Sequence, residues 1–197
     1  MCGRYFFSNS YRNNTVGTEL MEILNDTYGE CSVIEILPGN EAPVFIHSGN
    51  AYRVQKMKWG FTAAKGKRVI NARVETLHER VMFSSLTNGS RCVVPASGYY
   101  EWRMGDRQKF SISMKDGEDI AYFAGLFRHE ENGHSFTIIT RCANAEASEI
   151  HNRMPLILKN REYAEKWLYG EKAELFLQEE IALDIKAEGA EQLRMLF

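Results

Sequence analysis

Residues 109–114 read KFSISM, residues 119–127 read DIAYFAGLF and residues 135–142 read SFTIITRC, and these three runs decide the fold class. They are rich in β-branched and aromatic residues, a composition typical of strands. The pairs Asp116-Gly117 and Asn132-Gly133 stand between them, and such a pair between two strand-like runs is a strong hairpin signal. The stretch therefore predicts an antiparallel β meander in which each run pairs with the next.

Shorter patterns flank this meander. Apolar side chains recur at helical spacing from Leu20 to Tyr28, just before Gly29, which predicts a helix over 17–28 with the glycine at its C-terminal cap. The N-terminal run Tyr5-Phe6-Phe7 reads as a strand tied into the fold. Further strands are expected at 31–37, 42–48 and 51–59, and further helices near 76–87, near 145–151 and twice after residue 160, where Asn160 is placed to cap REYAEKWL.

These elements leave few places for a strand–helix–strand crossover, so antiparallel pairing is favoured over a parallel sheet. We expect an α+β fold with a strongly curved, mainly antiparallel sheet or barrel-like core and peripheral helices. No repeat, low-complexity tract or Pro/Gly/Ser-rich linker divides the 197 residues. We therefore expect one domain over 1–197, with a motif-bearing core at 2–158 and a helical C-terminal extension at about 160–180.

Composition and charge narrow the function classes. The hydrophobic fraction of 44% and the charged fraction of 25% are those of an ordinary globular protein. Because the net charge is −2, any contact with DNA must use a local basic cleft rather than the overall field. We find neither an apolar run of membrane-spanning length nor a signal peptide, so a cytoplasmic location is expected. The four scattered cysteines indicate no disulfide framework, and nothing indicates a metal or an organic cofactor.

The chain opens MCGRYFF, which puts a cysteine directly behind the initiator methionine. Methionine aminopeptidase acts before small residues, and removal of Met1 would leave Cys2 with an amine and a thiol on adjacent carbons. The amine, of pKa about 7.7–8.0, and the thiol, of pKa about 8.5, are both partly nucleophilic near neutral pH. Such a 1,2-aminothiol condenses with an aldehyde to an imine and then closes a thiazolidine ring. A retained Met1 would leave only the thiol.

Two other interpretations of Cys2 stay open. An N-terminal cysteine can act as a hydrolytic nucleophile with its own amine as the base. It can also be a small buried hydrophobic residue at the start of a strand.

Four further segments carry candidate residues. In RCVVPASGYYEW, Glu101 is a carboxylate among apolar and aromatic residues, where burial would raise its pKa toward that of a general acid/base. The alternative is an outward-facing position beside Arg103. In VINARVETL, Asn71 and Arg73 would share one face of a strand and suit an oxyanion or phosphate, unless Arg73 pairs with Glu75.

The segment ANAEASEIHNRMP places His151 and Arg153 at the end of a short helix, just before Pro155. Histidine exchanges protons readily at neutral pH, although a histidine at a helix end is more often structural. In MKWGF, the indole of Trp59 is either part of the core or a stacking platform for a base.

Seven motifs occur in one order along residues 2 to about 158: MCGRY, the stretch from Pro38 to Pro43, KWG, NARVET, RCVVPASGYYEW, TRCAN and IHNRMP. In this order they resemble the SOS response-associated peptidase (SRAP) family. The resemblance implies a protein that shields abasic sites in single-stranded DNA through a covalent thiazolidine cross-link at the N-terminal cysteine. It also implies a curved antiparallel β core with flanking helices, and a protein associated with the nucleoid when it is bound to DNA.

Carried over residue by residue, the resemblance makes Cys2 the nucleophile, through both nitrogen and sulfur. Asn71 would hold the Cys2 amine or the new ring, Glu101 would shuttle protons, and His151 would help to open the sugar at its O4′ oxygen. The resemblance further implies contacts with DNA: Arg4, Arg73 and Arg153 would hold flanking phosphates, and Trp59 and Pro38 would lie against the bases beside the lesion.

The chain departs from the family pattern in three places. It reads WGFTAAK where many members read WGLIPxW, which alters the expected stacking surface next to Trp59. It reads GYYEW where GFYEW is usual. The motif TRCAN replaces a commoner Thr-Thr pair and brings in Arg141 and Cys142, to which no role is assigned.

Two alternative functions use the same residues. One is a thiol peptidase or autoprocessing enzyme in which Cys2, Glu101 and His151 remove a short N-terminal peptide. The other is a non-covalent module for single-stranded DNA that relies on Trp59 and the arginines. A lyase-like incision through the imine would accompany the covalent function. The sequence indicates no protein partner.

Overall fold

The computed structural model describes residues 2–8, 15–29, 31–49, 51–115, 120–131 and 133–189. Its centre is a closed barrel in which the strands pair in the order β12–β4–β3–β8–β11 and β11 returns to β12. The five strands are β3 (Glu41–Ser48), β4 (Ala51–Trp59), β8 (Arg91–Ala96), β11 (Ala121–Glu130) and β12 (Gly133–Cys142). Closure removes the exposed edges of this sheet. The expected barrel-like, mainly antiparallel core is confirmed, and only β12–β4 pairs in parallel within the ring.

Short strands extend the barrel sheet. β7 (Asn71–Arg73) pairs in parallel with β12, β13 (Arg153–Pro155) pairs with the end of β12, and β14 (Ile157–Leu158) pairs with β11. β5 (Phe61–Thr62) and β6 (Arg68–Val69) form a separate two-stranded hairpin around the short 3-10 helix η2 (Ala64–Gly66). β12 therefore pairs with both β7, which begins with Asn71, and β13, which begins with Arg153.

A second sheet holds the start of the chain. Its order is β15–β10–β9–β1–β2, and it consists of β1 (Tyr5–Ser8), β2 (Val33–Ile36), β9 (Gly98–Trp102), β10 (Lys109–Met114) and β15 (Leu183–Ala187). Tyr5 lies opposite Ile36 on one side and Tyr99 on the other. The prediction that the N-terminal run is a strand within the fold is confirmed.

One of the two predicted hairpins is wrong. β10 pairs with β9 and β15, whereas β11 pairs with β8, β12 and β14, so 109–114 and 119–127 belong to different sheets. The Asp116-Gly117 pair itself lies outside the described residues. The second hairpin is confirmed, because β11 and β12 pair up to Glu130 opposite Gly133; Asn132 again lies outside the described residues.

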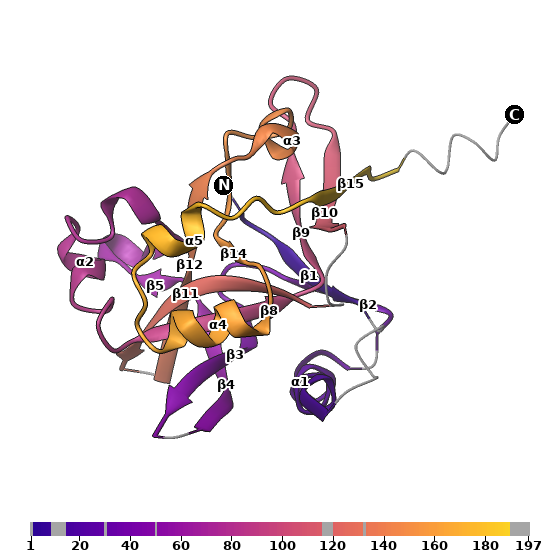
Figure 1. Cartoon of the computed structure of the whole chain (residues 1–197). Coiled ribbons are helices and arrows are strands. Elements are labelled where there is room, and N and C mark those ends of the chain that lie inside the picture. Colours follow the sequence, from indigo (N-terminus) through magenta and orange to yellow (C-terminus); the bar gives the residue numbers. More distant parts are fainter. Residues whose placement is uncertain are drawn as a thin grey trace, which may run out of the picture.

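Helices surround the barrel, and most match the predictions (Figure 1). α1 (Thr15–Tyr28) packs on β3 and is followed directly by Gly29, which has φ 78°. α3 (Ala145–Ser148), α4 (Arg161–Leu168) and α5 (Glu174–Leu177) follow later, and Asn160 caps α4 by accepting a bond from the Tyr163 amide. Near 76–87, where the sequence predicts helical structure, the helices are short: η3 (Val74–Thr76) and α2 (Val81–Ser84).

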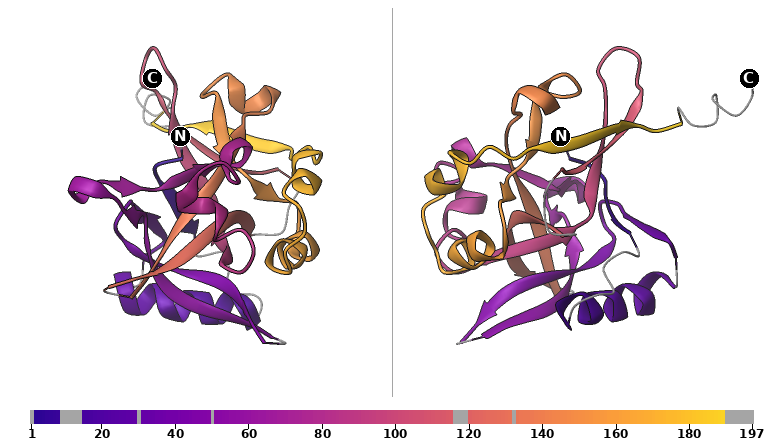
Figure 2. Two further views of the ribbon diagram at one scale, coloured as in Figure 1. Left: turned by 90° about the vertical axis from the view of Figure 1, so that its left-hand side faces the viewer. Right: turned by 45° about the vertical axis from the view of Figure 1, so that its right-hand side comes forward.

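The C-terminal segment forms a strand as well as helices. After α5 the chain forms β15, a strand that the sequence did not predict, which lies along β10 from Leu183 to Ala187. Figures 1 and 2 show β15 and the start of the chain at one end of the molecule, with α1 at the opposite end. A search of the described residues finds no helix with the length and apolarity needed to span a membrane.

Candidate functional site

The start of the chain is held between two sheets. Cys2 is fully buried, and the Arg4 carbonyl two residues later accepts a hydrogen bond from the Tyr100 amide at 2.9 Å. On the barrel side, the Asn71 Nδ2 donates a hydrogen bond to the Cys2 carbonyl at 2.8 Å. Because β7 pairs with β12, Asn71 lies in register with Ile138. The barrel thus fixes the amide that holds the Cys2 backbone.

Glu101 reaches this region from β9. A Cβ added to Gly98 would collide with the Ile112 backbone carbonyl on β10 and lie 2.9 Å from the Phe6 ring on β1, so glycine is required there. Glu101 is only 7% exposed. Burial raises the pKa of its carboxyl above the usual range, although the positive charge at the chain's amino terminus opposes that rise. A carboxyl in this state can both donate and accept a proton.

The Cys2 thiol lies in the same electrostatic environment. Burial raises its pKa well above the usual range, and the negative charge of Glu101 raises it further. The thiol is therefore protonated at neutral pH. Before its sulfur can attack, a neighbouring base must accept its proton.

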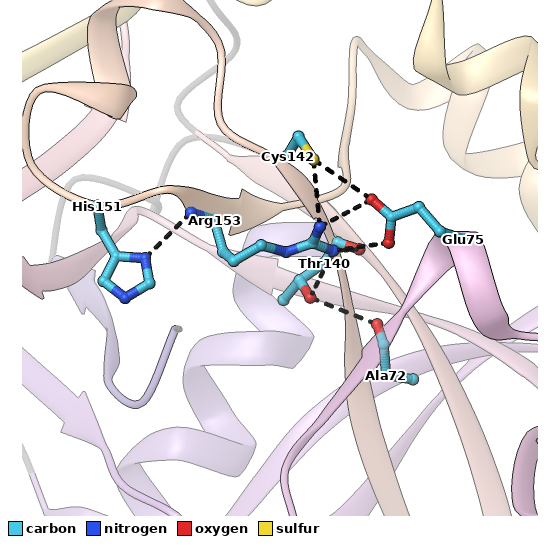
Figure 3. Close-up of polar contacts among 6 residues, drawn as sticks. All are labelled: Ala72, Glu75, Thr140, Cys142, His151 and Arg153. Carbon is cyan, nitrogen blue, oxygen red and sulfur yellow. Dashed lines mark hydrogen bonds and ion pairs between the residues drawn. The ribbon is translucent and has the colours of Figure 1, made fainter.

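His151 lies between α3 and β13. Its Nδ1 accepts a hydrogen bond from the Arg153 amide at 3.0 Å (Figure 3), so a neutral ring carries its proton on Nε2. Burial lowers the pKa of His151, and the positive charge at the amino terminus lowers it further. The neutral imidazole is thus favoured, with Nε2–H as a hydrogen-bond donor.

Tyr99 is a further polar group in this region, and the sequence motifs did not indicate it as a site residue. Its hydroxyl is buried, and no atom of the described residues makes a hydrogen bond with it. Burial raises its pKa well above the usual range, and the charges of Cys2 and Glu101 act in the same direction. The signal in the sequence was the change from GFYEW to GYYEW, which adds one hydroxyl beside Glu101.

Arg153 is engaged within the protein. Its guanidinium makes two hydrogen bonds to the Glu75 carboxylate, at 2.7 and 3.0 Å, and a third to the Thr140 carbonyl at 2.7 Å (Figure 3). Its side chain is only 11% exposed. The Cys142 thiol lies 3.4 Å from one guanidinium nitrogen. A DNA phosphate would have to compete with Glu75 for Arg153.

The other two predicted phosphate contacts differ from each other. Arg4 pairs with Glu35 at 2.8 Å and lies over the Trp102 ring. Arg73 is exposed, and within the described chain no carboxylate lies at ion-pair distance from it. The suggested pair between Arg73 and Glu75 is wrong, because Glu75 binds Arg153 instead.

Trp59 and Pro38 are neighbours, but only one is on the surface. The Trp59 carbonyl accepts a bond from Gly39, the residue after Pro38, at 2.8 Å. Pro38 is exposed in this turn. The Trp59 ring is fully buried, stacks on Phe136 and donates from Nε1 to the Ile70 carbonyl at 3.0 Å. The base-stacking role expected for Trp59 is therefore corrected: the indole is part of the core.

The described residues contain no group of three or more His, Cys, Asp or Glu side chains that could hold a metal ion. The side chains around Cys2 offer several groups for chemistry. They supply a nucleophile, a carboxyl with a raised pKa, a neutral imidazole and an amide that fixes the backbone.

The chain matches the family model described as "SOS response associated peptidase (SRAP)" over residues 1–193. It is 31% identical over 181 residues to the abasic site processing protein YoqW of Bacillus subtilis, covering 85% of this chain and 80% of that one. It is 29% identical over 179 residues to the abasic site processing protein YedK of Escherichia coli, covering 85% and 79%. The crystal structure of a protein from Bacteroides thetaiotaomicron shares the fold, with a TM-score of 0.71, 24% identity and coverage of 96% and 94%.

Proposed function

The chain belongs to the SOS response associated peptidase (SRAP) family, and from this premise we propose that it recognises abasic sites in single-stranded DNA and captures them covalently through Cys2 once Met1 is removed. The names of YoqW and YedK support abasic sites as the substrate. The observation that carries the proposal is the hydrogen bond from Asn71 to the Cys2 carbonyl, beside Glu101, whose negative charge acts on the Cys2 thiol.

The proposed reaction is a condensation without a redox step. The Cys2 amine adds to the aldehyde carbon of the ring-opened deoxyribose, and loss of one water gives an imine. The thiol sulfur then adds to the same carbon as the C=N double bond becomes single; the thiol gives its proton to a base, and the ring nitrogen takes up a proton, so the closed thiazolidine carries an N–H. Two bonds form to the aldehyde carbon, and one molecule of water is released overall.

The side chains suit these proton transfers. Because burial raises the pKa of Glu101, its protonated form can donate to the departing hydroxyl and its ionised form can accept the thiol proton. His151 presents Nε2–H as a donor for the O4′ oxygen while Nδ1 is occupied by the Arg153 amide. Asn71 keeps the Cys2 backbone in place, which is a positioning role. The same imine gives a route to reversal and to lyase-like strand incision.

The test is adduct formation with a single-stranded oligonucleotide that carries one abasic site. Processed protein is expected to give a product that survives denaturation, with the combined mass of protein and DNA less one water. Cys2→Ala should abolish the product, and Cys31→Ala, at an exposed cysteine, should not change it. An unchanged yield with Cys2→Ala would overturn covalent capture, and wholly reversible, salt-sensitive binding would favour a non-covalent binding module.

A second activity is favoured by the peptidase description of the family model. Cys2, Glu101 and His151 would cleave the peptide bond before Cys2, so the protein would release its own Met1. Expressed without methionine aminopeptidase, Cys2→Ala and Glu101→Ala proteins should retain Met1 in an intact mass measurement. Normal loss of Met1 from both variants would show that self-cleavage is not needed.

A further inference from the structure

A polar groove that does not include Cys2 is lined by residues of β3, β4, β5, β6 and the facing ends of β11 and β12. Its volume is about 640 Å³. The basic side chains that line it are Lys56, Lys58, Arg68, Arg128, His129 and His134. Three glutamates also line it, so its charge depends on which cations are already paired.

Two of the four lysines and arginines are paired within the protein. Lys56 lies 3.4 Å from Glu41, and Arg128 lies 2.6 Å from Glu130, which also accepts bonds from Thr62. Lys58 and Arg68 have no carboxylate at ion-pair distance within the described chain. Of the three glutamates, Glu131 has no cation at ion-pair distance within the described chain, so the unpaired cations exceed the unpaired carboxylates and the groove keeps positive charge available to an anionic ligand.

Arg68 is held in place at the rim. Its Nη1 donates to the Gly60 carbonyl at 3.2 Å. A Cβ added to Gly60 would lie 3.1 Å from the Arg68 Cβ, and one added to Gly39 would lie 3.4 Å from its Nε. Both glycines have positive φ, and because neither carries a Cβ, their turns leave room for the Arg68 side chain. A guanidinium fixed in this way loses little side-chain entropy when it binds a phosphate.

The adjoining hairpin adds two more cations. Lys65 and Lys67 flank Gly66 between β5 and β6, and both are exposed. Neither has a carboxylate at ion-pair distance among the residues that the structure describes. Together with Arg68 they place three cations within four residues of a protein whose net charge is −2.

The groove is close to the candidate site along the chain. Arg68 begins β6, and Asn71, which holds the Cys2 carbonyl, begins β7 three residues later. An extended segment of this length spans about 10 Å. A strand whose abasic sugar reaches Cys2 can therefore continue past Asn71 to Arg68.

We propose that this groove, with Arg68 at its rim and the Lys65–Lys67 turn beside it, binds the phosphate backbone of the single-stranded DNA that flanks the abasic site. The identity of the ligand as DNA rests on the proposed function. The contact is electrostatic and independent of base sequence, because lysine and arginine contacts to phosphates carry no base information. It extends the DNA interface beyond the arginines that the sequence suggested.

The test compares Lys65→Gln/Arg68→Gln with a control of equal charge change, Lys115→Gln/Lys172→Gln, whose lysines are exposed and do not line the groove. Binding is measured on single strands of about 16 and about 4 nucleotides that carry a non-reactive abasic analogue at the centre. The groove variant should bind the long strand about tenfold more weakly at low salt. Loss of two phosphate contacts should also flatten its log–log salt dependence by about 1.4.

Binding of the short strand should be unchanged. An equal loss with the control variant, or an equal loss on the short strand, would overturn the proposal. A third ligand, in which the flank of the abasic site is double-stranded, tests whether the groove takes single-stranded or double-stranded DNA. A loss of binding seen only with this ligand would overturn the single-strand assignment. Adduct formation by the unsubstituted protein is assayed separately, so failure of covalent capture and failure of the groove give different results.

Discussion

At the scale of single residues, Tyr99 has a hydroxyl that is buried without a hydrogen-bond partner among the described residues. A buried hydroxyl in this state costs about 1–3 kcal/mol. Tyr99→Phe keeps the ring, which lies edge-on to Phe123, and removes only the oxygen. We therefore expect the free energy of unfolding to rise by about 1 kcal/mol, measured by urea denaturation.

Tyr163 supplies the matched control for this prediction. Its hydroxyl donates to Glu179 at 2.7 Å, so Tyr163→Phe removes a satisfied hydrogen bond and should lower stability slightly. If Tyr99→Phe lowered stability as Tyr163→Phe does, the Tyr99 hydroxyl would have a partner in solution.

Glu101 makes stability depend on pH. Burial raises its folded-state pKa above the unfolded value of about 4.3, so between the two pKa values the native state binds a proton that the unfolded state has released. The contribution of Glu101 to stability is complete below the unfolded pKa and is lost as the pH rises through the folded pKa. Glu101→Gln should therefore be more stable than the unsubstituted protein at about pH 7 and equal to it near pH 4.

This pH dependence is measured by urea denaturation at both pH values, with Glu79→Gln, at an exposed carboxylate outside the groove, as the control. Glu101→Gln should at the same time reduce adduct formation, because the amide cannot transfer protons. A variant that lost stability at neutral pH would contradict the direction of the pKa shift.

Sequence patterns could nominate Cys2, Asn71, Glu101 and His151, because these residue types have recognisable chemistry in short motifs. They could not decide which side chains face solvent. The Trp59 indole stacks on Phe136, a residue far along the chain, and that packing buries it. In the same way the partner of Arg153 proved to be Glu75, which lies on a different element.

At the scale of elements, the ion pair between Glu75 and Arg153 joins η3 to β13 across the end of β12. Glu75→Gln leaves the mostly buried guanidinium without its carboxylate, but Glu75 itself is 44% exposed, so solvent moderates the cost. We expect a loss of about 1 kcal/mol in the free energy of unfolding.

The matched control is Glu165→Gln, which breaks an exposed pair with Arg161 within α4. Such helix pairs contribute about 0.2–0.5 kcal/mol, so this variant should lose less than Glu75→Gln. Equal losses would mean that the pair between Glu75 and Arg153 does not connect the elements energetically.

Element types were easier to predict than strand partners. Asn160, Gly29 and the Asn132-Gly133 signal act over a few residues, and the elements that they mark are present. The Asp116-Gly117 signal is equally local, yet β10 finds its partners in β9 and in β15, which is about seventy residues away. Pairing is decided by which sheets bury the apolar faces, and a turn motif does not encode that choice.

At the scale of the whole molecule, the groups that hold the start of the chain in place differ from the groups that react. Regular structure begins at Tyr5, where β1 enters the second sheet between β2 and β9. Before β1, the carbonyls of Cys2 and Arg4 accept hydrogen bonds from Asn71 and from the Tyr100 amide, and neither bond requires a free amino group at Cys2. Covalent capture nevertheless requires the amine and the thiol to belong to the same first residue.

This separation predicts the effect of extending the chain at its start. Protein with a removable segment before Cys2 should unfold at the same urea concentration as the processed protein, because all pairs of β1 are retained. It should form no adduct with abasic single-stranded DNA, since the thiol alone cannot close a thiazolidine. Proteolytic removal that leaves Cys2 first should restore the adduct, as followed by intact mass. Adduct formation by the extended protein would show that the amine is not a reactant, and a thiol-only mechanism would then replace the one proposed here.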